Sequence, residues 1–205
     1  MLLILSSRDF RNENSRRCII EHLNKPIDQC RVLFFPNEKA SSRQIQNGKY
    51  HVWMQQRGFQ RENIHVFNYY SPDGFDTLDI DCLYISGGNT FQMMDRIRRS
   101  HADELIVEYI QRGVTYIGGS AGVHIVSSSI AHLLPIDGNP TGISDVSGLG
   151  LFPGILFCHY GEARRVYYEQ AVAEGRFPVY ALTDEQSLVF DGEVHIFSAE
   201  GETLL

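Results

Sequence analysis

The sequence predicts an α/β protein: a three-layer α/β/α sandwich with a mostly parallel sheet, helices on both faces and a C-terminal antiparallel hairpin. Short apolar runs alternate with longer amphipathic segments through most of the chain, and these runs show little alternation of polar and apolar residues. Strands that are buried on both faces of a parallel sheet have this pattern. A change to alternating runs near the C-terminus predicts the hairpin.

Five short apolar runs are the expected parallel strands. They are residues 2–5, 31–35, 64–70, 81–86 and 114–118. Helical patterns lie between and after them, at residues 41–58, 101–113 and 161–175. Each gathers apolar side chains on one stripe and ends at a glycine, as helices commonly do. Strands and helices that alternate in this way are joined by crossover connections, which build a parallel sheet with helices on both faces.

The last part of the chain has a different pattern. Residues 187–198 contain two alternating runs joined by Asp191-Gly192. This dipeptide between alternating runs is a strong hairpin signal, so we expect an antiparallel edge on the main sheet. The chain has no break in composition, internal repeat or low-complexity stretch. We therefore expect residues 1–205 to form a single domain.

Composition and charge argue against several classes of partner. The formal net charge is −7, and such a chain repels phosphate backbones unless its cations are concentrated locally. The densest basic clusters, at residues 96–99 and 164–165, are not interleaved with aromatic residues, so we expect no nucleic-acid partner. No run approaches the ~18 apolar residues that span a bilayer, and residues 1–10 lack the basic start of a signal peptide. We expect a cytoplasmic protein with no membrane partner and with buried free cysteines.

One motif carries a candidate nucleophile. Residues 118–122 read Gly-Gly-Ser-Ala-Gly and fit the G-x-S-x-G pattern, in which a serine lies at the apex of a sharp strand-to-helix turn. Small residues on either side of Ser120 let the neighbouring chain pass without a clash. The N–H of Ala121 would lie at a helix N-terminus, where it can stabilise a developing oxyanion. The alternative is a tight glycine-rich turn whose serine only caps a helix.

A second glycine-rich turn follows another buried strand. Residues 87–90 read Gly-Gly-Asn-Thr and precede a helical pattern. Loops at the carboxyl ends of parallel strands line the ligand crevice of an open α/β sheet, so we expect the two turns to face each other. The N–H of Gly88 is then a second oxyanion donor. The glycine spacing fits neither the dinucleotide-binding motif nor the P-loop.

A nucleophilic serine needs a base, and an acid that orients the base. His159 is the preferred base because it ends an apolar run and is therefore expected at the same sheet edge as Ser120; His132 is the alternative. Asp137 and Asp145 lie between serine and histidine in the sequence and are candidates for the acid. The order Ser, Asp, His is that of the α/β-hydrolases, but too few residues separate Ser120 from Asp137 for the units that this fold inserts there.

Three stretches of the chain, YISGGNTFQMM, YIGGSAG and LGLFPGILFCHY, resemble the peptidase E (α-aspartyl dipeptidase) and cyanophycinase family. Its members are serine peptidases on a fold similar to class I glutamine amidotransferases, and the resemblance covers nearly the whole chain. The residues that it implies are Ser120 as nucleophile, His159 as base, Asp137 as acid, and Gly88 and Ala121 as oxyanion donors. Asp145 is the alternative acid.

The resemblance also implies residues that bind the substrate. In the family, an arginine in a G-E-T-R-E motif after the histidine reads the β-carboxylate of the substrate. Here Gly-Glu-Ala-Arg follows the histidine after a shorter loop, so Arg164 is expected to bind that carboxylate with its planar fork. The alternative for Arg164 is a solvated helix residue. Glu185 matches an acidic family position near the site, and Asn89 is expected to contact the substrate.

These expectations describe a serine peptidase of small peptides, with N-terminal Asp-Xaa dipeptides as the expected substrates. We expect a monomer or a small homo-oligomer. No metal or cofactor is implied, because the sequence has neither H-E-x-x-H nor cysteine and histidine at zinc spacing. Two other interpretations stay open: an amidase or acyl transferase on the same scaffold, and a non-catalytic small-molecule-binding member of the fold.

Overall fold

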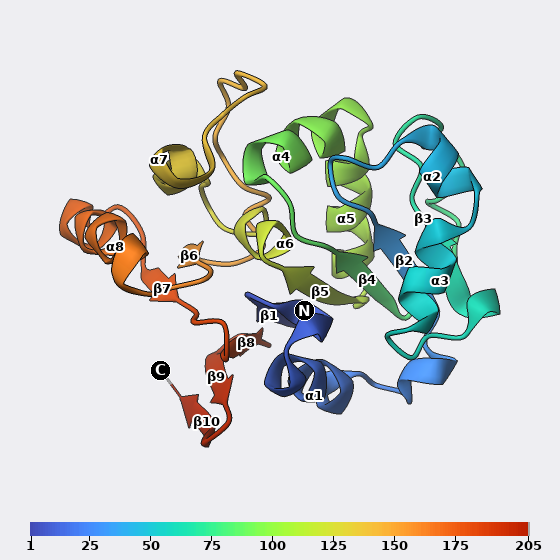
Figure 1. Cartoon of the computed structure of the whole chain (residues 1–205), viewed down its shortest axis with the longest axis horizontal. Coiled ribbons are helices and arrows are strands. Elements are labelled where there is room, and N and C mark those ends of the chain that lie inside the picture. The colour runs from blue at the N-terminus through green and yellow to red at the C-terminus, as the bar shows by residue number, and fades with distance from the viewer. Residues whose placement is uncertain (205) are drawn as a thin grey trace.

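The computed structural model, which describes residues 1–204, is built around an eight-stranded sheet with the strand order β10-β9-β8-β1-β5-β4-β2-β3 (Figure 1). The parallel strands are β1 (Leu3–Ser6), β5 (Thr115–Gly119), β4 (Cys82–Ile85), β2 (Val32–Phe35) and β3 (Ile64–Val66). Every residue of β1, β2, β4 and β5 is buried. Burial on both faces explains why their sequences are largely apolar without alternation.

The C-terminal strands form an antiparallel edge on this sheet. They are β8 (Ser187–Phe190), β9 (Val194–Ser198) and β10 (Gly201–Leu204). β8 pairs antiparallel with β1, so the edge continues directly from the parallel part. The hairpin predicted at Asp191-Gly192 is confirmed by the pairing of Phe190 with Val194, and Gly192 takes a φ of 131° that favours glycine.

Helices cover both faces of the sheet. The face that carries Leu83 and Ile85 is covered by α4 (Thr90–Arg99), α5 (Ala102–Gln111) and α6 (Ala121–His124). The opposite face, with Cys82 and Tyr84, is covered by α1 (Glu13–His22), α2 (Ser42–Gln46) and α3 (Lys49–Gln55). Adjacent residues of β4 point to opposite faces, so one strand supplies side chains to both cores. The predicted three-layer α/β fold is thereby confirmed.

Two expected elements differ in length from the prediction. The helical segment 41–58 is divided into α2 and α3, because Gly48 takes the left-handed conformation with a φ of 79° and interrupts the helix. The expected strand 64–70 ends at Val66. Asn68 then accepts a hydrogen bond from the N–H of Tyr70 at 3.2 Å, which makes a turn in place of further strand. Short 3₁₀ helices lie at η1 (Asp9–Arg11), η2 (Ile27–Gln29), η3 (Arg61–Asn63) and η4 (Ala131–Leu133).

The apolar run before His159 belongs to a separate small sheet. β6 (Ile155–Phe157) pairs in parallel with β7 (Val179–Ala181), and α8 (Glu162–Glu174) connects the two strands. α7 (Leu134–Asp137) precedes β6 in the chain. The pairing continues beyond β7, since the N–H of Tyr160 donates to Leu182 O at 2.9 Å. The segment after β7 therefore runs beside His159.

The four cysteines are buried and unpaired, as expected. Within residues 1–204, no helix combines the length and the apolar character that a membrane crossing requires.

Candidate active site

Ser120 lies at a sharp turn between β5 and α6. Its backbone has a φ of 48° and a ψ of −104°, a region that residues with a side chain rarely occupy. Hydrogen bonds from Ser120 N to Ser6 O (3.0 Å) and from Val123 N to Ser120 O (2.8 Å) fix the turn. Glycine is required on both sides. A Cβ on Gly118 would lie 2.8 Å from the carbonyl oxygen of Gly122, and one on Gly122 would collide with the backbone of β4.

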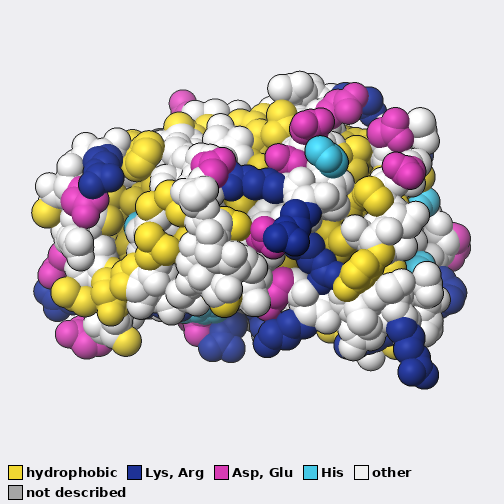
Figure 2. All heavy atoms as spheres, turned by 90° about the horizontal axis from the view of Figure 1, so that it is seen from above, with side chains coloured by type: hydrophobic (Ala, Val, Ile, Leu, Met, Phe, Trp, Pro, Cys, Tyr) yellow, Lys and Arg dark blue, Asp and Glu magenta, His cyan; other side chains and the backbone are white. Residues whose placement is uncertain are grey.

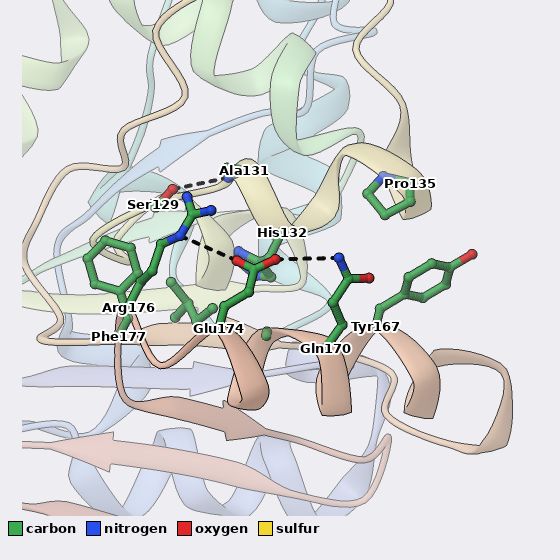
Figure 3. A pocket seen from close by; sticks show the side chains of 11 residues that line it. Ser129, Ala131, His132, Pro135, Tyr167, Gln170, Glu174, Arg176 and Phe177 are labelled. Carbon is green, nitrogen blue, oxygen red and sulfur yellow. Dashed lines mark hydrogen bonds and ion pairs between the residues drawn. The ribbon is translucent and has the colours of Figure 1, made fainter.

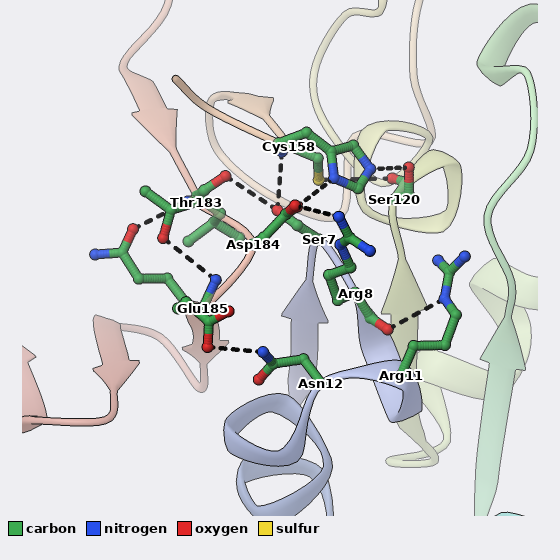
Figure 4. A network of polar contacts seen from close by, with 12 residues as sticks. Ser7, Arg8, Arg11, Asn12, Ser120, Cys158, Thr183, Asp184 and Glu185 are labelled. Carbon is green, nitrogen blue, oxygen red and sulfur yellow. Dashed lines mark hydrogen bonds and ion pairs between the residues drawn. The ribbon is translucent and has the colours of Figure 1, made fainter. Parts of the chain in front are cut away.

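The side chains of Ser120, His159 and Asp184 form an unbroken hydrogen-bonded chain (Figure 4). Ser120 Oγ lies 3.0 Å from His159 Nε2, and His159 Nδ1 lies 2.5 Å from Asp184 Oδ1. An ionised carboxylate only accepts hydrogen bonds, so Nδ1 carries the proton in the neutral imidazole. Nε2 then has a lone pair directed at the serine hydroxyl, which allows His159 to take the proton of Ser120.

Both oxygens of Asp184 have partners. Arg8 Nη2 donates to Asp184 Oδ2 at 2.6 Å, while Oδ1 faces the imidazole of His159. The hydrogen bond from Arg8, followed by the one from His159, lowers the pKa of Asp184 to about 2. The carboxylate is therefore charged at neutral pH, and it can stabilise the imidazolium that forms when His159 accepts a proton.

The backbone of His159 is also constrained. Its φ is 53°, and its N–H donates to Ser7 Oγ at 3.0 Å. The preceding peptide is held on both sides: Cys158 N donates to His124 Nε2 at 3.2 Å, and Cys158 O accepts from Arg164 Nη1 at 2.6 Å. A strained backbone persists only where its surroundings hold it firmly. These contacts supply that support.

Asp137 and Asp145, the two acids considered from the sequence, do not make the contact expected of them. Asp137 Oδ2 accepts hydrogen bonds from Thr90 Oγ1 (2.6 Å) and from Thr90 N (3.2 Å). Asp145 leaves 66% of its side chain exposed. Asp184 is the carboxylate at Nδ1 of His159, because the chain after β7 returns beside the histidine.

Asp137 belongs to a buried network on the other side of the histidine loop. Since His124 Nε2 accepts from Cys158 N, its Nδ1 carries the proton and donates to Thr90 Oγ1 at 3.0 Å. The hydroxyl of Thr90 in turn donates to Asp137. Burial lowers the pKa of His124 well below its usual range, so the imidazole is neutral. The network joins α4, α6 and α7 to the peptide immediately before His159.

The two glycine-rich turns face each other, as expected. An ideal Cβ built on Gly87 would lie 3.1 Å from Ser120 Cβ, so the turn after β4 is packed directly against the serine. Gly88 follows Gly87 on that turn, and Ala121 directly follows Ser120. The two residues expected to donate to the oxyanion therefore lie on the two facing turns. An ideal Cβ on Gly88 would meet the carboxylate of Glu38, so that side chain also packs against this turn.

The three residues expected to bind substrate are engaged elsewhere. Asn89 Oδ1 caps α4, and Glu185 Oε2 accepts from Asn12 Nδ2 at 2.7 Å. Arg164 is partly buried and does not line the cavity beside the serine, and its guanidinium donates to Cys158 O at 2.6 Å. The residues that line that cavity do not include Asn89, Arg164 or Glu185.

A cavity of about 360 Å³ opens beside the serine, a volume within the range of small-molecule sites. Its lining includes Ser120, His159, Gly87, Gly88, Arg8 and Arg11. The two arginines and Asp184 were not selected from the sequence. Signals for them existed: Arg8 follows β1, the neighbour of β5, at the same sheet edge as Ser120, and Asp184 immediately precedes Glu185.

A second cavity of about 230 Å³ lies between α8 and the segment η4–α7 (Figure 3). His132, the alternative base, is part of its lining, and His132 Nε2 lies 2.9 Å from Leu156 O. Arg176 pairs there with Glu174 at 3.5 Å. The two cavities share no lining residue, so His132 does not line the cavity beside Ser120.

Charged side chains of both signs are intermixed on the face seen from above in Figure 2. Lysine and arginine side chains lie next to acidic ones on this face and form no continuous basic stripe. Proteins that bind a nucleic-acid backbone usually carry a continuous stripe or patch of positive charge.

Comparisons with known proteins cover most of the chain. The model of Peptidase family S51 matches residues 2–197. A Peptidase E of Shewanella denitrificans is 32% identical over 207 residues, which cover 93% of this chain and 84% of that protein. The uncharacterized peptidases Lmo0363 of Listeria monocytogenes and Lin0382 of Listeria innocua are 30% and 46% identical over 55% and 60% of this chain. These two matches span 58% and 62% of the relatives' own lengths.

Two solved structures share the fold. A candidate peptidase E protein from Listeria monocytogenes EGD-e superimposes with a TM-score of 0.74 at 22% identity, covering 96% of this chain and 98% of that one. A peptidase from an acI-B1 Actinobacterium gives a TM-score of 0.63 at 16% identity, covering 100% of this chain and 93% of that one.

Proposed function

Since the chain belongs to peptidase family S51, we propose that it is a serine peptidase that hydrolyses small peptides through Ser120, His159 and Asp184. The observation that carries the proposal is the pair of contacts from Ser120 Oγ to His159 Nε2 (3.0 Å) and from His159 Nδ1 to Asp184 Oδ1 (2.5 Å). In such an arrangement the base removes the serine proton and the acid holds the base in the required tautomer.

The first half of the reaction forms an acyl-enzyme. Ser120 Oγ attacks the carbonyl carbon of the scissile peptide bond while its proton moves to His159 Nε2. The resulting oxyanion accepts hydrogen bonds from the N–H groups of Gly88 and Ala121, on the two facing turns. The tetrahedral intermediate then breaks at the C–N bond, and His159 gives the proton to the departing amine.

The second half releases the product. A water molecule gives its proton to His159 Nε2 and attacks the ester carbonyl of the acyl-enzyme. The C–O bond to Ser120 breaks, and the same proton returns to Ser120 Oγ. Asp184 keeps its charge throughout and stabilises the imidazolium in both halves, as its lowered pKa of about 2 allows.

Dipeptides with an acidic first residue, such as Asp-Leu, are the substrates that we propose first. A cavity of about 360 Å³ suits a ligand of a few residues. Arg8, Asp9 and Arg11 line it, and the Nη groups of Arg11, which make no hydrogen bond to the protein within residues 1–204, can attract a substrate carboxylate.

The proposal is tested by replacing the nucleophile. Ser120→Ala should lower kcat on Asp-Leu on the order of 10⁴-fold or more, because only binding and oxyanion stabilisation survive the loss of the hydroxyl. Ser144→Ala, at an exposed serine in the segment after α7, is the matched control and should leave kcat unchanged. Equal turnover by the wild type and Ser120→Ala, with equal melting temperatures, would refute the assignment.

A further inference from the structure

Arg11 lies beside the candidate nucleophile, with its guanidinium on the side of Ser120 (Figure 4). An ideal Cβ built on Gly87 would lie 3.1 Å from Ser120 Cβ and 3.7 Å from Arg11 Nη2. The serine and the guanidinium therefore both lie next to Gly87, on the glycine-rich turn after β4. The Arg11 side chain is 53% exposed, so a ligand in the cavity can reach it.

Arg11 is anchored along one edge of its guanidinium. Its Nε donates to Asp9 Oδ1 at 3.2 Å and to Arg8 O at 3.4 Å. Asp9 is itself held firmly: only 2% of its side chain is exposed, its φ is 45°, and a Cβ on Gly119 would collide with its carboxylate. Within residues 1–204, Nε is the donor in every hydrogen bond of the Arg11 side chain. Both Nη groups are thus left to bind a ligand.

The other arginines near the site are committed to protein partners. Arg8 Nη2 donates to Asp184 Oδ2 at 2.6 Å. Arg164 donates to Cys158 O and does not line the cavity. Among the described lining residues, Arg11 is the cation whose two Nη groups both lack a protein acceptor.

We propose that Arg11 binds a carboxylate of the substrate and makes the protein selective for peptides with an acidic group next to the scissile bond. This inference rests on the proposed function, because it places the carboxylate relative to Ser120. The N–H groups of a guanidinium match the two oxygens of a carboxylate. In Asp-Leu, the side-chain carboxylate and the C-terminal carboxylate are the same number of covalent bonds from the scissile carbonyl carbon. Both are therefore within reach of Arg11 when that carbon meets Ser120 Oγ.

The test compares kcat/KM of the wild type and Arg11→Gln on Asp-Leu, Asn-Leu and Asp-Leu amide. Asn-Leu lacks the side-chain charge, and the amide lacks the C-terminal charge. We expect Arg11→Gln to lower kcat/KM on Asp-Leu by about 10- to 100-fold. The preference of the wild type over one of the two analogues should disappear in the variant, and that analogue identifies the bound carboxylate. An equal loss on all three substrates, or no loss on any, would overturn the inference.

Two further variants separate charge recognition from general effects. Arg165→Gln removes the same charge from an exposed position on α8, where Arg165 pairs with Glu169, and should leave all three kcat/KM values unchanged. Arg11→Lys keeps the charge but loses the planar fork, and should keep part of the preference. Equal effects of Arg165→Gln and Arg11→Gln would overturn the inference. Melting temperatures of the variants report whether the fold is preserved.

The affinity for a peptide that is not turned over reports the role of Arg11 in binding independently of catalysis. In the Ser120→Ala protein, calorimetry with Asp-Leu should show about 10-fold weaker binding, or more, once Arg11→Gln is added. Equal affinity of the two proteins would overturn the role of Arg11, even where Ser120 is shown to be the nucleophile. Weaker binding in a protein that hydrolyses nothing would support the carboxylate site and refute only the peptidase proposal.

Discussion

Ser120 and His159 both take positive φ angles, 48° and 53°, although neither is glycine. Such conformations cost about 1–3 kcal/mol each, and they persist where neighbouring contacts hold them. In these conformations the serine hydroxyl and the imidazole point toward each other, with Ser120 Oγ 3.0 Å from His159 Nε2. The same two residues carry the proposed proton transfer.

Replacing Asp184 and Asp137 in turn tests which of these two carboxylates orients His159. Asp184→Asn should lower kcat by about 10³- to 10⁴-fold, because an amide can donate to Nδ1 and so favour the wrong tautomer of His159. Asp137→Asn makes the same chemical change at a carboxylate that contacts Thr90, and should lower kcat far less. The kcat of both variants on Asp-Leu is measured side by side. A larger loss in Asp137→Asn would restore Asp137 as the acid.

At the level of elements, Ser120 follows a strand of the main sheet, whereas His159 is positioned by segments outside that sheet. α4, α6 and α7 meet through the network of His124, Thr90 and Asp137, and the network ends on the peptide of Cys158. The small sheet of β6 and β7 brings the segment after β7 beside His159. The base is therefore positioned by packing between elements rather than by the end of a strand in the main sheet.

Thr90→Val tests this positioning. Thr90 is fully buried, and a valine side chain of similar shape can bond neither His124 Nδ1 nor Asp137 Oδ2. The buried imidazole then loses its acceptor, and Asp137 keeps only the bond from the N–H of residue 90. We expect the free energy of unfolding in urea to fall by about 1–3 kcal/mol, and kcat on Asp-Leu to fall as well.

Thr141→Val is the matched control for that experiment. Thr141 is exposed, and its hydroxyl makes only a long contact to Asn139 Oδ1 at 3.4 Å. Its replacement should change the free energy of unfolding by less than about 0.5 kcal/mol. Similar losses in Thr90→Val and Thr141→Val would contradict a positioning role for the network.

At the scale of the whole molecule, the three-layer fold could be predicted because its signals are local in the sequence. Runs such as residues 81–86 are apolar throughout because both faces of the strand are buried, and Asp191-Gly192 marks its own turn. These features need no information on which distant segments pair. The approach of His159 to Ser120 was also expected, but on the premise that His159 ends a strand of the main sheet, and the pairing of β6 with β7 contradicts that premise.

The pairing of β6, the contact of Asp184 and the position of Arg164 depend instead on contacts between segments that are far apart in the sequence. β6 was expected to lead to the edge of the main sheet, but it pairs with β7, a strand of three residues whose sequence alone gives a weak signal. Asp184 reaches His159 only because of that pairing, and so the orienting contact could not be read from spacing. Arg164 was expected in the substrate site and is instead used to hold the peptide before His159.

Covalent labelling with a fluorophosphonate tests the central claim, an activated hydroxyl at residue 120, most directly. Mass spectrometry of the labelled wild type should find a single adduct on Ser120. Labelling should be absent in Ser120→Ala and strongly slowed in His159→Gln, because the imidazole no longer removes the serine proton. A folded wild type that takes no label, or one that carries the label on a different serine, would contradict the account.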